Sequence, residues 1–483
     1  MWGLTPQRNM VWPHDANIRT DLDPGKLVGR SGQVEEGSTK HVKWVAKLGS
    51  QAYGNPTVAD GRVYVGTNNA SPRDSKYTGD RSVVLCLDEK TGEMIWQYNV
   101  RKLGGGKVAD WEFLGICSSP AVEGDRVYVV SNLCEVVCLD VNGMADGNQG
   151  VTDEATYYAE QGADPLTLGP TDADVIWRYD MAEELGVFPH NISSNSPVVA
   201  GDVVWVATSN GVDWSHVNIP NPRAPALIGL NKTTGELVAE EASGVSQRML
   251  HCNWSSPAYV EHEGKGMVVW GGGDGYAYAF DAVPVKDADG FGILKELWRV
   301  DLNPPQYRRD ADGQPIKYAT PPGPSEAIST PVFHDGKVYI GIGQDPEHGI
   351  GVGAWTCIDL VTGKLLWQYT GINRTISTAS VHDGLVYIAD YAGVVHCLDA
   401  DTGQIKWTHD TQAYIWGSTL VADGKVLIGN EDGYLTILQA KGGDKNVLAE
   451  IEFPAPIYSS PIIAHGTLYI ATQSHLYAFD AGK

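Results

Sequence analysis

The sequence predicts an all-β fold, a single eight-bladed β-propeller of four-stranded antiparallel blades. The first observation behind this prediction is a repeated stretch, which residues 118–130 show whole. A small polar pair and a proline precede a β-rich run, a glycine turn and a second β-rich run, which is typical of two antiparallel strands joined by a tight turn. Six copies carry the proline, at Pro56, Pro120, Pro197, Pro257, Pro331 and Pro461, and two weaker copies lie at Thr378-Ala379 and Ser418-Thr419.

The other observations are the number and the length of the copies. Eight copies account for most of the 483 residues, and helical periodicity is missing between them. A strand-built repeat of this length indicates a propeller in which each copy forms one blade. Length alone would allow two or three domains, but the repeat favours one domain over residues 41–483.

A turn with the pattern Asp-x-x-Thr-Gly joins the third and fourth strands of the predicted blades. It occurs at 88–92, 359–363 and 399–403, with an Asn variant at 231–235. The Asp side chain caps such a turn, and the glycine takes the position with positive φ. A tryptophan follows on the fourth strand, and we expect its large side chain to be buried between blades. The tryptophans at this position are Trp96, Trp367 and Trp407, with Trp177 and Trp298 after longer insertions.

The eighth copy ends at Asp480 without a fourth strand. Residues 41–48, which contain Trp44, have the character of the missing strand. We therefore expect this N-terminal strand to complete the last blade and close the ring, so that no sheet edge stays open between the first and last blades. Residues 1–40 are irregular and rich in proline, glycine and charge, and we expect this extension to wrap the outside of the ring or to be partly mobile.

Composition narrows the classes of partner. The formal charge of −24 argues against nucleic acid and anionic membrane surfaces. The chain has no apolar run of about 18 residues, so we expect no membrane span. Cys117 and Cys134 belong to one blade, and the sequence leaves open whether they pair. Four other cysteines share one repeat position on different blades and should not pair with one another: Cys86, Cys138, Cys357 and Cys397.

The repeated pattern Ala/Cys-x-Asp-x-x-Thr-Gly-x-x-x-Trp resembles the tryptophan-docking motif of the pyrroloquinoline-quinone (PQQ) dehydrogenase superfamily. The resemblance covers the chain from about Trp44 onward and is nearer to PQQ-binding-like repeat proteins than to the methanol and alcohol dehydrogenases. The superfamily also includes the propeller lipoprotein of the outer-membrane β-barrel assembly machinery, which carries no quinone. The resemblance therefore implies the fold more strongly than the chemistry. We also expect a periplasmic or otherwise extracytoplasmic protein, whose signal peptide is absent from this sequence.

A binding site is expected on the face that carries two sets of loops: those entering the first strand of each blade and those between the second and third strands. We call it the entry face. Its loops contain histidines, carboxylates, one arginine and several tryptophans, which short loops do not need for folding; a polar, hydrated channel rim is the alternative interpretation. The predicted ligand-binding residues are His190, Asn191, Asn210, Trp214, His216, Trp254, His348, Tyr391 and Trp416, and the candidate catalytic residues are His251, Glu326, Arg374 and Asp390. Trp111, Glu112, Asp274, Asp345 and Tyr458 belong to the same loops.

The sequence suggests two alternatives for a bound ion, one in these loops and one in a separate stretch. A metal held by some of the four histidines is one, although no tight spacing supports it. The other is Ca²⁺ in the long insertion of the second blade, where Asp146, Asn148 and Asp153 alternate with glycine and asparagine without matching an EF-hand. A solvated turn cluster explains that insertion equally well.

The enzymes that the chain resembles hold PQQ on a Ca²⁺ ion, with a nearby cation and an Asp base. By resemblance, Asn210 and Glu135 match the Ca²⁺ ligands. The expected Asp is missing from residues 251–253, the expected Arg is missing from residues 273–275, and no adjacent cysteine pair exists. Bound PQQ is therefore doubtful, and Ca²⁺ remains an alternative. The Cys-x-x-Cys-His motif is also missing, so we expect no c-type haem.

These observations favour a binding platform over an enzyme, without settling the choice. The leading hypothesis is that the His- and Trp-rich face of the channel binds a small molecule or a partner protein. One alternative is a quinoprotein-type oxidoreductase acting on an alcohol or sugar, with Asn210 and Glu135 or Glu347 on Ca²⁺, Arg374 as the cation, and His251 or Asp390 as the base. Another is a carbohydrate-active hydrolase or lyase that uses His190, His251, Glu326 and Arg374.

Overall fold

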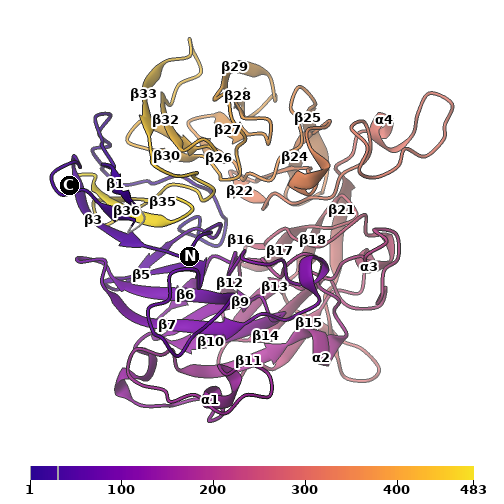
Figure 1. Ribbon diagram of the computed structural model, residues 1–483. Helices are drawn as coiled ribbons and strands as arrows, with labels where there is room; N and C mark the ends of the chain where they lie inside the picture. Colours follow the sequence, from indigo (N-terminus) through magenta and orange to yellow (C-terminus); the bar gives the residue numbers. More distant parts are fainter. Residues whose placement is uncertain (1, 30–31, 483) are drawn as a thin grey trace.

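The computed structural model describes residues 2–29 and 32–482, and it confirms the eight-bladed propeller. Eight blades of four antiparallel strands follow one another in sequence order around a common centre (Figure 1). The innermost strand of each blade is short and follows the repeated small polar pair, as predicted. The first four blades consist of β4 (Thr57–Ala59), β5 (Arg62–Asn68), β6 (Arg81–Asp88) and β7 (Met94–Arg101); β8 (Ala121–Glu123), β9 (Arg126–Ser131), β10 (Glu135–Asp140) and β11 (Val175–Asp180); β12 (Val198–Ala200), β13 (Val203–Ala207), β14 (Leu227–Asn231) and β15 (Leu237–Glu240); and β16 (Ala258–His262), β17 (Lys265–Gly271), β18 (Tyr276–Asp281) and β21 (Glu296–Asp301).

The other four blades repeat this arrangement. The last one takes its outer strand from the N-terminal part of the chain. They consist of β22 (Val332–His334), β23 (Lys337–Gly341), β24 (Trp355–Asp359) and β25 (Leu365–Tyr369); β26 (Ser380–His382), β27 (Leu385–Ala389), β28 (Val394–Asp399) and β29 (Ile405–Asp410); β30 (Leu420–Ala422), β31 (Lys425–Gly429), β32 (Tyr434–Gln439) and β33 (Val447–Glu452); and β34 (Ile462–Ala464), β35 (Thr467–Ala471), β36 (His475–Asp480) and β3 (Val42–Lys47).

Elements outside the blades are short. The third sheet is wider than predicted, because β20 pairs with β15 and β19 pairs with β20. No helix in the described ranges is long and apolar enough to cross a membrane. The additional elements are β1 (Leu27–Val28), β2 (Gln33–Val34), β19 (Val285–Lys286), β20 (Gly292–Ile293), α1 (Glu154–Tyr157), α2 (Met181–Leu185), α3 (Val245–Arg248), α4 (Pro305–Arg308) and the 3₁₀ turns η2 (Gly106–Val108), η3 (Gly143–Asp146) and η4 (Pro346–His348).

The last blade is closed as the sequence predicts. Strand β3 pairs antiparallel with β36, and Trp44 lies opposite Ala478. The Trp44 indole donates a hydrogen bond to the Glu89 carbonyl of the first blade, 2.9 Å away. The closure therefore joins the first and last blades through both a strand ladder and a buried side chain.

Buried tryptophans join neighbouring blades in the same way around most of the ring. Each indole donates to a backbone carbonyl of the next blade, and each is buried, as predicted for core residues. Gly92 shows why the turn needs glycine: its φ is 72°, and a Cβ there would lie 2.5 Å from the ring of Trp44. The pairs are Trp96 with Val141, Trp177 with Lys232, Trp298 with Leu360, Trp367 with Ala400 and Trp407 with Lys441.

The repeated small polar residue has its own role in closing the ring. The backbone N–H of this residue in one blade donates to the side-chain oxygen of its counterpart in the next blade. Seven of the eight junctions carry this bond, at 2.7–3.3 Å, from Asn55 to Ser119 and onward to Ser460, which donates back to Asn55. A circle of short side chains therefore fixes where the entry loops meet the channel.

The N-terminal segment, residues 2–12, lies inside the channel and not outside the ring, so the expected position was wrong for this segment. It crosses the end of the channel opposite the entry loops. There the backbone N–H of Trp12 donates to the Val421 carbonyl, and the backbone N–H of Tyr259 donates to the Pro6 carbonyl. Arg8 anchors it. Its guanidinium is fully buried and donates to the carbonyls of Trp2, Ser196, Pro197 and Pro257 at 3.0–3.2 Å.

Candidate functional site

Loops of the third and fourth blades are tied together on the entry face by backbone hydrogen bonds. Gly211 donates to the Phe188 carbonyl at 2.8 Å, and Val212 donates to the His251 carbonyl at 2.9 Å. Gly211 allows this close approach, because a Cβ there would lie 2.4 Å from the Cβ of His190. The local fold therefore brings His190 and His251, which are distant in sequence, to opposite sides of one short segment.

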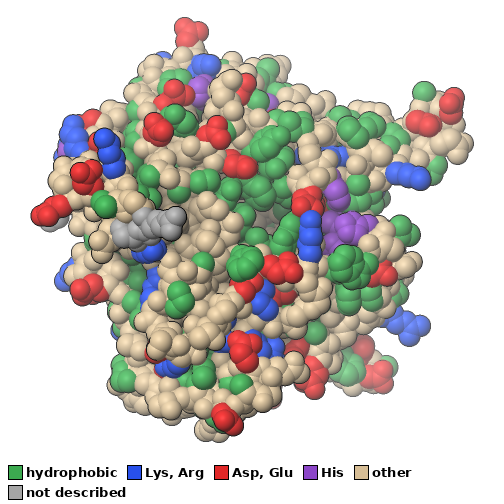
Figure 2. Space-filling model, in the orientation of Figure 1, with side chains coloured by type: hydrophobic (Ala, Val, Ile, Leu, Met, Phe, Trp, Pro, Cys, Tyr) green, Lys and Arg blue, Asp and Glu red, His purple; other side chains and the backbone are tan. Residues whose placement is uncertain are grey.

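Four of the predicted residues form a histidine cluster: His190, His216, His251 and His348. In the first three, one ligand atom from each ring lies within 4.8 Å of the others. The ring centroids of His251 and His348 are 5.2 Å apart, and those of His216 and His348 are 6.3 Å apart. Figure 2 shows histidine side chains gathered near a hollow in this face. His190 and His251 are buried, whereas His216 is exposed.

The buried imidazoles of the cluster have few polar partners. His190 Nδ1 lies 2.6 Å from the Val212 carbonyl, so it carries the proton and donates. His190 Nε2 and both nitrogens of His251 have no hydrogen-bond partner within the described parts of the chain. Burial lowers the pKa of His190 to about 4 and that of His251 to about 2. Both rings are therefore neutral at pH 7, with lone pairs free.

A buried carboxyl stands beside the cluster. Tyr318 donates its hydroxyl to Glu326 Oε1 at 3.0 Å, and His251 Nδ1 lies 3.9 Å from the same oxygen. Burial raises the pKa of Glu326 to about 8. Sequence reasoning named Glu326 but missed Tyr318, because it belongs to the insertion between β21 and β22, which has no counterpart in other blades.

An aromatic cavity of about 530 Å³ opens next to the cluster, at the centre of the entry face. It lies where one repeat position points into the channel. This position is the third residue before the repeated proline, which is replaced by Ala379 and Thr419 in the two weaker copies. In seven blades that residue lines the cavity. In the eighth blade it is Tyr458, which lies behind the lining and stacks on Tyr53 with 4.8 Å between ring centroids. Only three of these residues were predicted, although their common spacing could have identified all of them. The residues at this position are Tyr53, Cys117, Ser194, Trp254, Ile328, Ile376, Trp416 and Tyr458.

Aromatic rings concentrate on one side of this cavity. Trp416 lies 5.6 Å from Tyr53, 5.6 Å from Tyr391 and 5.3 Å from Tyr458 between ring centroids. Trp111 and Trp254 line other parts of the wall. Trp254 also lies 5.1 Å from His251, so the cavity and the histidine cluster share a wall. Trp214, in contrast, is 72% exposed and does not line the cavity.

Carboxylates border the cavity. Asp345 accepts a hydrogen bond from the side-chain amide of Asn191 at 2.6 Å, and Glu431 accepts one from the Trp416 indole at 2.7 Å. Glu347 also lines the cavity and forms an ion pair with Lys107 at 2.6 Å. The Lys107 ammonium lies 4.0 Å from the centroid of the Trp111 ring. The polar border is thus richer in negative than in positive groups.

Two predicted site residues have all or most of their polar atoms bonded within the scaffold. The Asn210 side chain accepts from the Phe188 N–H and donates to the Asn221 carbonyl and Ser246 Oγ. Asp390 accepts from His396 Nε2 at 3.1 Å and from the backbone and side chain of Asn373. Both side chains are buried and hold loops in place.

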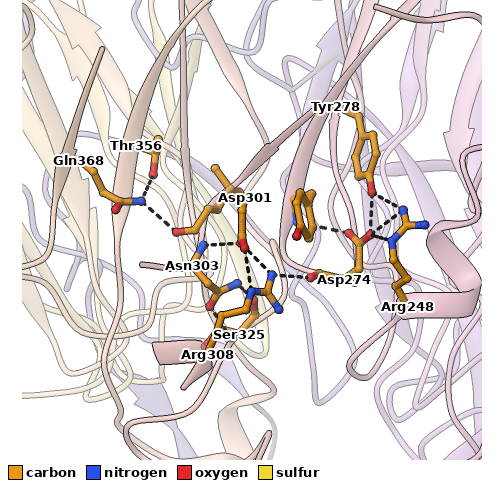
Figure 3. A network of polar contacts seen from close by, with 11 residues as sticks. Arg248, Asp274, Tyr278, Asp301, Asn303, Arg308, Ser325, Thr356 and Gln368 are labelled. Carbon is orange, nitrogen blue, oxygen red and sulfur yellow. Dashed lines mark hydrogen bonds and ion pairs between the residues drawn. The ribbon is translucent and has the colours of Figure 1, made fainter. Parts of the chain in front are cut away.

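Asp274 belongs to a polar network beneath the loops of the fourth blade (Figure 3). It accepts hydrogen bonds from Tyr278 at 2.6 Å and from Arg248 at 3.2 Å. Arg308 donates to its backbone carbonyl and forms an ion pair with Asp301 at 2.7 Å. This rim carboxylate is therefore saturated by its neighbours.

Arg374 connects loops that surround the histidine cluster. It is buried and donates to the carbonyls of His348 and Thr320, with a long third contact to Gly349. Burial lowers the pKa of its guanidinium. The side chain positions the loop that bears His348.

The residues expected to hold Ca²⁺ are engaged elsewhere. Glu135 is buried and accepts from Tyr157 and Ser131. With the Asn210 amide also bonded to the scaffold, the two residues matched by resemblance do not fit a Ca²⁺-bound quinone. In the second-blade insertion, Asp146 accepts from Asn142, Asn148 donates to Glu154, and Asp153 pairs with Arg178. All seven cysteines are free thiols.

Comparisons with known proteins bear on the fold. Residues 294–483 match a family model described as outer membrane protein assembly factor BamB. No curated protein shows significant sequence similarity to the chain. Among solved structures, BamB from Moraxella catarrhalis is similar with a TM-score of 0.55 and 14% identity, over 90% of this chain and 96% of that one.

Two dehydrogenases share the same architecture. The quinohemoprotein alcohol dehydrogenase ADHIIG from Pseudomonas putida HK5 has a TM-score of 0.58 and 14% identity, over 91% of this chain and 76% of the other. A europium-containing methanol dehydrogenase has a TM-score of 0.58 and 14% identity, over 98% and 88%. The family match over residues 294–483 and this shared fold agree with the resemblance of the chain to the PQQ-like β-propeller superfamily.

Proposed function

We propose that this protein is an extracytoplasmic binding protein that takes a small, ring-shaped, uncharged or cationic ligand in the aromatic cavity. The observation that carries the proposal is the convergence of one repeat position from seven of the eight blades on a single cavity. Three of these seven residues are aromatic, and the volume of about 530 Å³ is in the usual range for small-molecule sites. Flat aromatic walls favour a ligand with a ring that can stack.

The charge of the cavity border supports the choice of ligand. Asp345, Glu347 and Glu431 stand at the border, while the charge of Lys107 is already opposed by Glu347. An anionic ligand would meet these carboxylates in a partly desolvated site, and like charges at short range cost free energy there. A cation would gain both from the carboxylates and from the faces of the aromatic rings.

The family description, an outer membrane protein assembly factor, supports the extracytoplasmic location. A partner protein is the other occupant that the channel face suits. A protein would need a larger contact surface than the cavity offers, so the cavity favours the small molecule.

Three matched probes test the proposal: quinoline, N-methylquinolinium and quinoline-2-carboxylate, which are neutral, cationic and anionic at pH 7.5. We expect saturable quenching of tryptophan fluorescence by the first two and at least tenfold weaker binding of the third. Trp416→Ala should weaken binding of the first two at least tenfold. Trp214→Ala, which changes an exposed tryptophan outside the cavity, should not. Preference for the anion, or equal binding by both variants, would overturn the proposal.

A further inference from the structure

We propose that His190, His216 and His251 form a binding site for one divalent transition-metal ion of the Zn²⁺ or Cu²⁺ kind. The proposal does not depend on a ligand in the aromatic cavity. It rests on the geometry of the three rings, on buried nitrogens without partners, and on the groups that orient the rings.

The donor set suits such an ion. The three ligand atoms lie within 4.8 Å of one another, and ligands of a tetrahedral Zn²⁺ site with Zn–N bonds of 2.0–2.1 Å stand about 3.3 Å apart. Small side-chain rotations close this difference, because His216 is exposed and free to move. An all-imidazole set favours Zn²⁺, Cu²⁺, Fe²⁺ or Ni²⁺ over Ca²⁺ and Mg²⁺, which prefer oxygen ligands.

The unpartnered nitrogens need an explanation that a metal supplies. Buried polar atoms are nearly always hydrogen-bonded, because an unpaired one has lost its hydrogen bonds to water without replacing them. His190 Nε2 and both nitrogens of His251 lack a protein partner throughout residues 2–29 and 32–482. A cation at the centre of the three rings would accept the free lone pairs of both buried histidines.

Outer groups orient these two rings as metal-binding histidines require. The Nδ1–H of His190 donates to the Val212 carbonyl, which leaves Nε2 as the ligand atom. Glu326 Oε1 lies 3.9 Å from His251 Nδ1, so a short movement completes a carboxylate–histidine–metal arrangement with His251 Nε2 as the ligand. Tyr318 holds that carboxyl in place. Glu326 is thus a positioning residue for the metal site.

Two residues lie near the fourth coordination position of the proposed metal ion. His348 lies 5.2 Å from His251, and its Nδ1 is buried without a partner in the described chain. Trp254 contacts the cluster and lines the aromatic cavity. Three protein ligands with a fourth position left for water or a ligand are typical of reactive metal sites, whereas a fourth histidine is typical of a closed one.

The test is a titration of chelator-treated full-length protein with Co²⁺ and Zn²⁺, with bound metal measured after gel filtration and Co²⁺ ligand-field bands recorded. We expect one equivalent of metal per chain. His216→Ala should weaken binding at least 100-fold, and because His216 is exposed the variant should fold. The control is His382→Ala, which removes a half-exposed histidine at the end of β26 and should bind as the wild type does.

A second pair of variants tests the positioning role. Glu326→Gln should weaken Zn²⁺ binding about 10–100-fold. Glu135→Gln, which alters another buried carboxyl away from the cluster, should leave it unchanged. Less than half an equivalent of metal at 100 μM, or equal affinity of wild type and His216→Ala, would overturn the proposal. Quinoline binding by His216→Ala and metal binding by Trp416→Ala separate this result from failure of the cavity proposal.

Discussion

The two ends of the channel differ in whether their buried polar side chains are hydrogen-bonded. At the end closed by the N-terminal segment, all three nitrogens of the Arg8 guanidinium donate to backbone carbonyls. At the entry face, His251 is equally buried, yet neither of its nitrogens has a partner among the described residues. Each end is built by the same repeat, so the contrast does not come from the blades.

The difference distinguishes polar side chains that hold the fold together from polar side chains that are available to bind a ligand. Arg8 has no carboxylate partner in the described part of the chain, and burial lowers its pKa to about 9, but its hydrogen bonds fix residues 2–12 across the channel. His251 gains no comparable hydrogen bond from the described residues. A buried group that the protein does not satisfy is better explained by something that binds there.

Removing the closure should have the largest effect on the scaffold. Deleting residues 1–48 removes Arg8 and strand β3, which leaves the β36 edge unpaired and Glu89 without Trp44. We expect loss of the cooperative unfolding transition by circular dichroism and a tendency to aggregate through the exposed edge. A truncated protein with the wild-type denaturation midpoint would contradict the closed ring.

Trp96 tests the contacts between blades. It is fully buried and donates to the Val141 carbonyl, so Trp96→Ala should lower the free energy of unfolding by about 3–5 kcal/mol. The exposed Trp214 offers a matched control, and Trp214→Ala should change it by less than about 0.5 kcal/mol. Urea denaturation measures both, and similar midpoints for the two variants would show that the blade contacts are misassigned.

Arg8 and His216 compare the two ends of the channel directly. Arg8→Ala leaves four carbonyls without their donor, and we expect it to cost about 3 kcal/mol of unfolding free energy. In chelator, His216→Ala should cost less than about 0.5 kcal/mol, because that ring is exposed. An equal loss of unfolding free energy by both variants in denaturant titrations would contradict the claim that Arg8 stabilises the fold and His216 does not.

The remaining prediction is a pH dependence of stability from Glu135. Burial raises its pKa from 4.5 to about 7, so the folded protein holds this proton more tightly than the unfolded chain. The contribution of Glu135 is therefore fully favourable below pH 4.5 and is lost as the pH rises toward 7. Glu135→Gln should become more stable relative to the wild type across this window. A difference between the two proteins that is constant from pH 4 to 8 would contradict the shift.

The fold could be predicted because its determinants are local and repeated. The small polar pair, the glycine turn and the tryptophan recur at fixed offsets, and each has one physical role in a blade. The position of residues 2–12 could not be predicted, since Arg8 binds backbone carbonyls, which leave no signature in side-chain pattern.

The site could be predicted only in part. The four histidines were assigned to loops of one face, and a metal held by some of them was an alternative, but no spacing in the sequence indicated which three lie together. Asn210 and Asp390 were expected at the site on equal grounds, yet their side chains are saturated by neighbouring loops. Whether a polar side chain faces the scaffold or the channel depends on contacts between blades, and these are not encoded in any single repeat.

The most direct test of the central claim is an anomalous difference map at the zinc edge from a crystal of the protein with one equivalent of Zn²⁺. The contrast between the channel ends predicts one strong peak, bounded by His190, His216 and His251, and none beside the N-terminal segment. A peak elsewhere, or an empty histidine cluster in protein that retains its zinc, would contradict the assignment of the unpartnered histidines to binding.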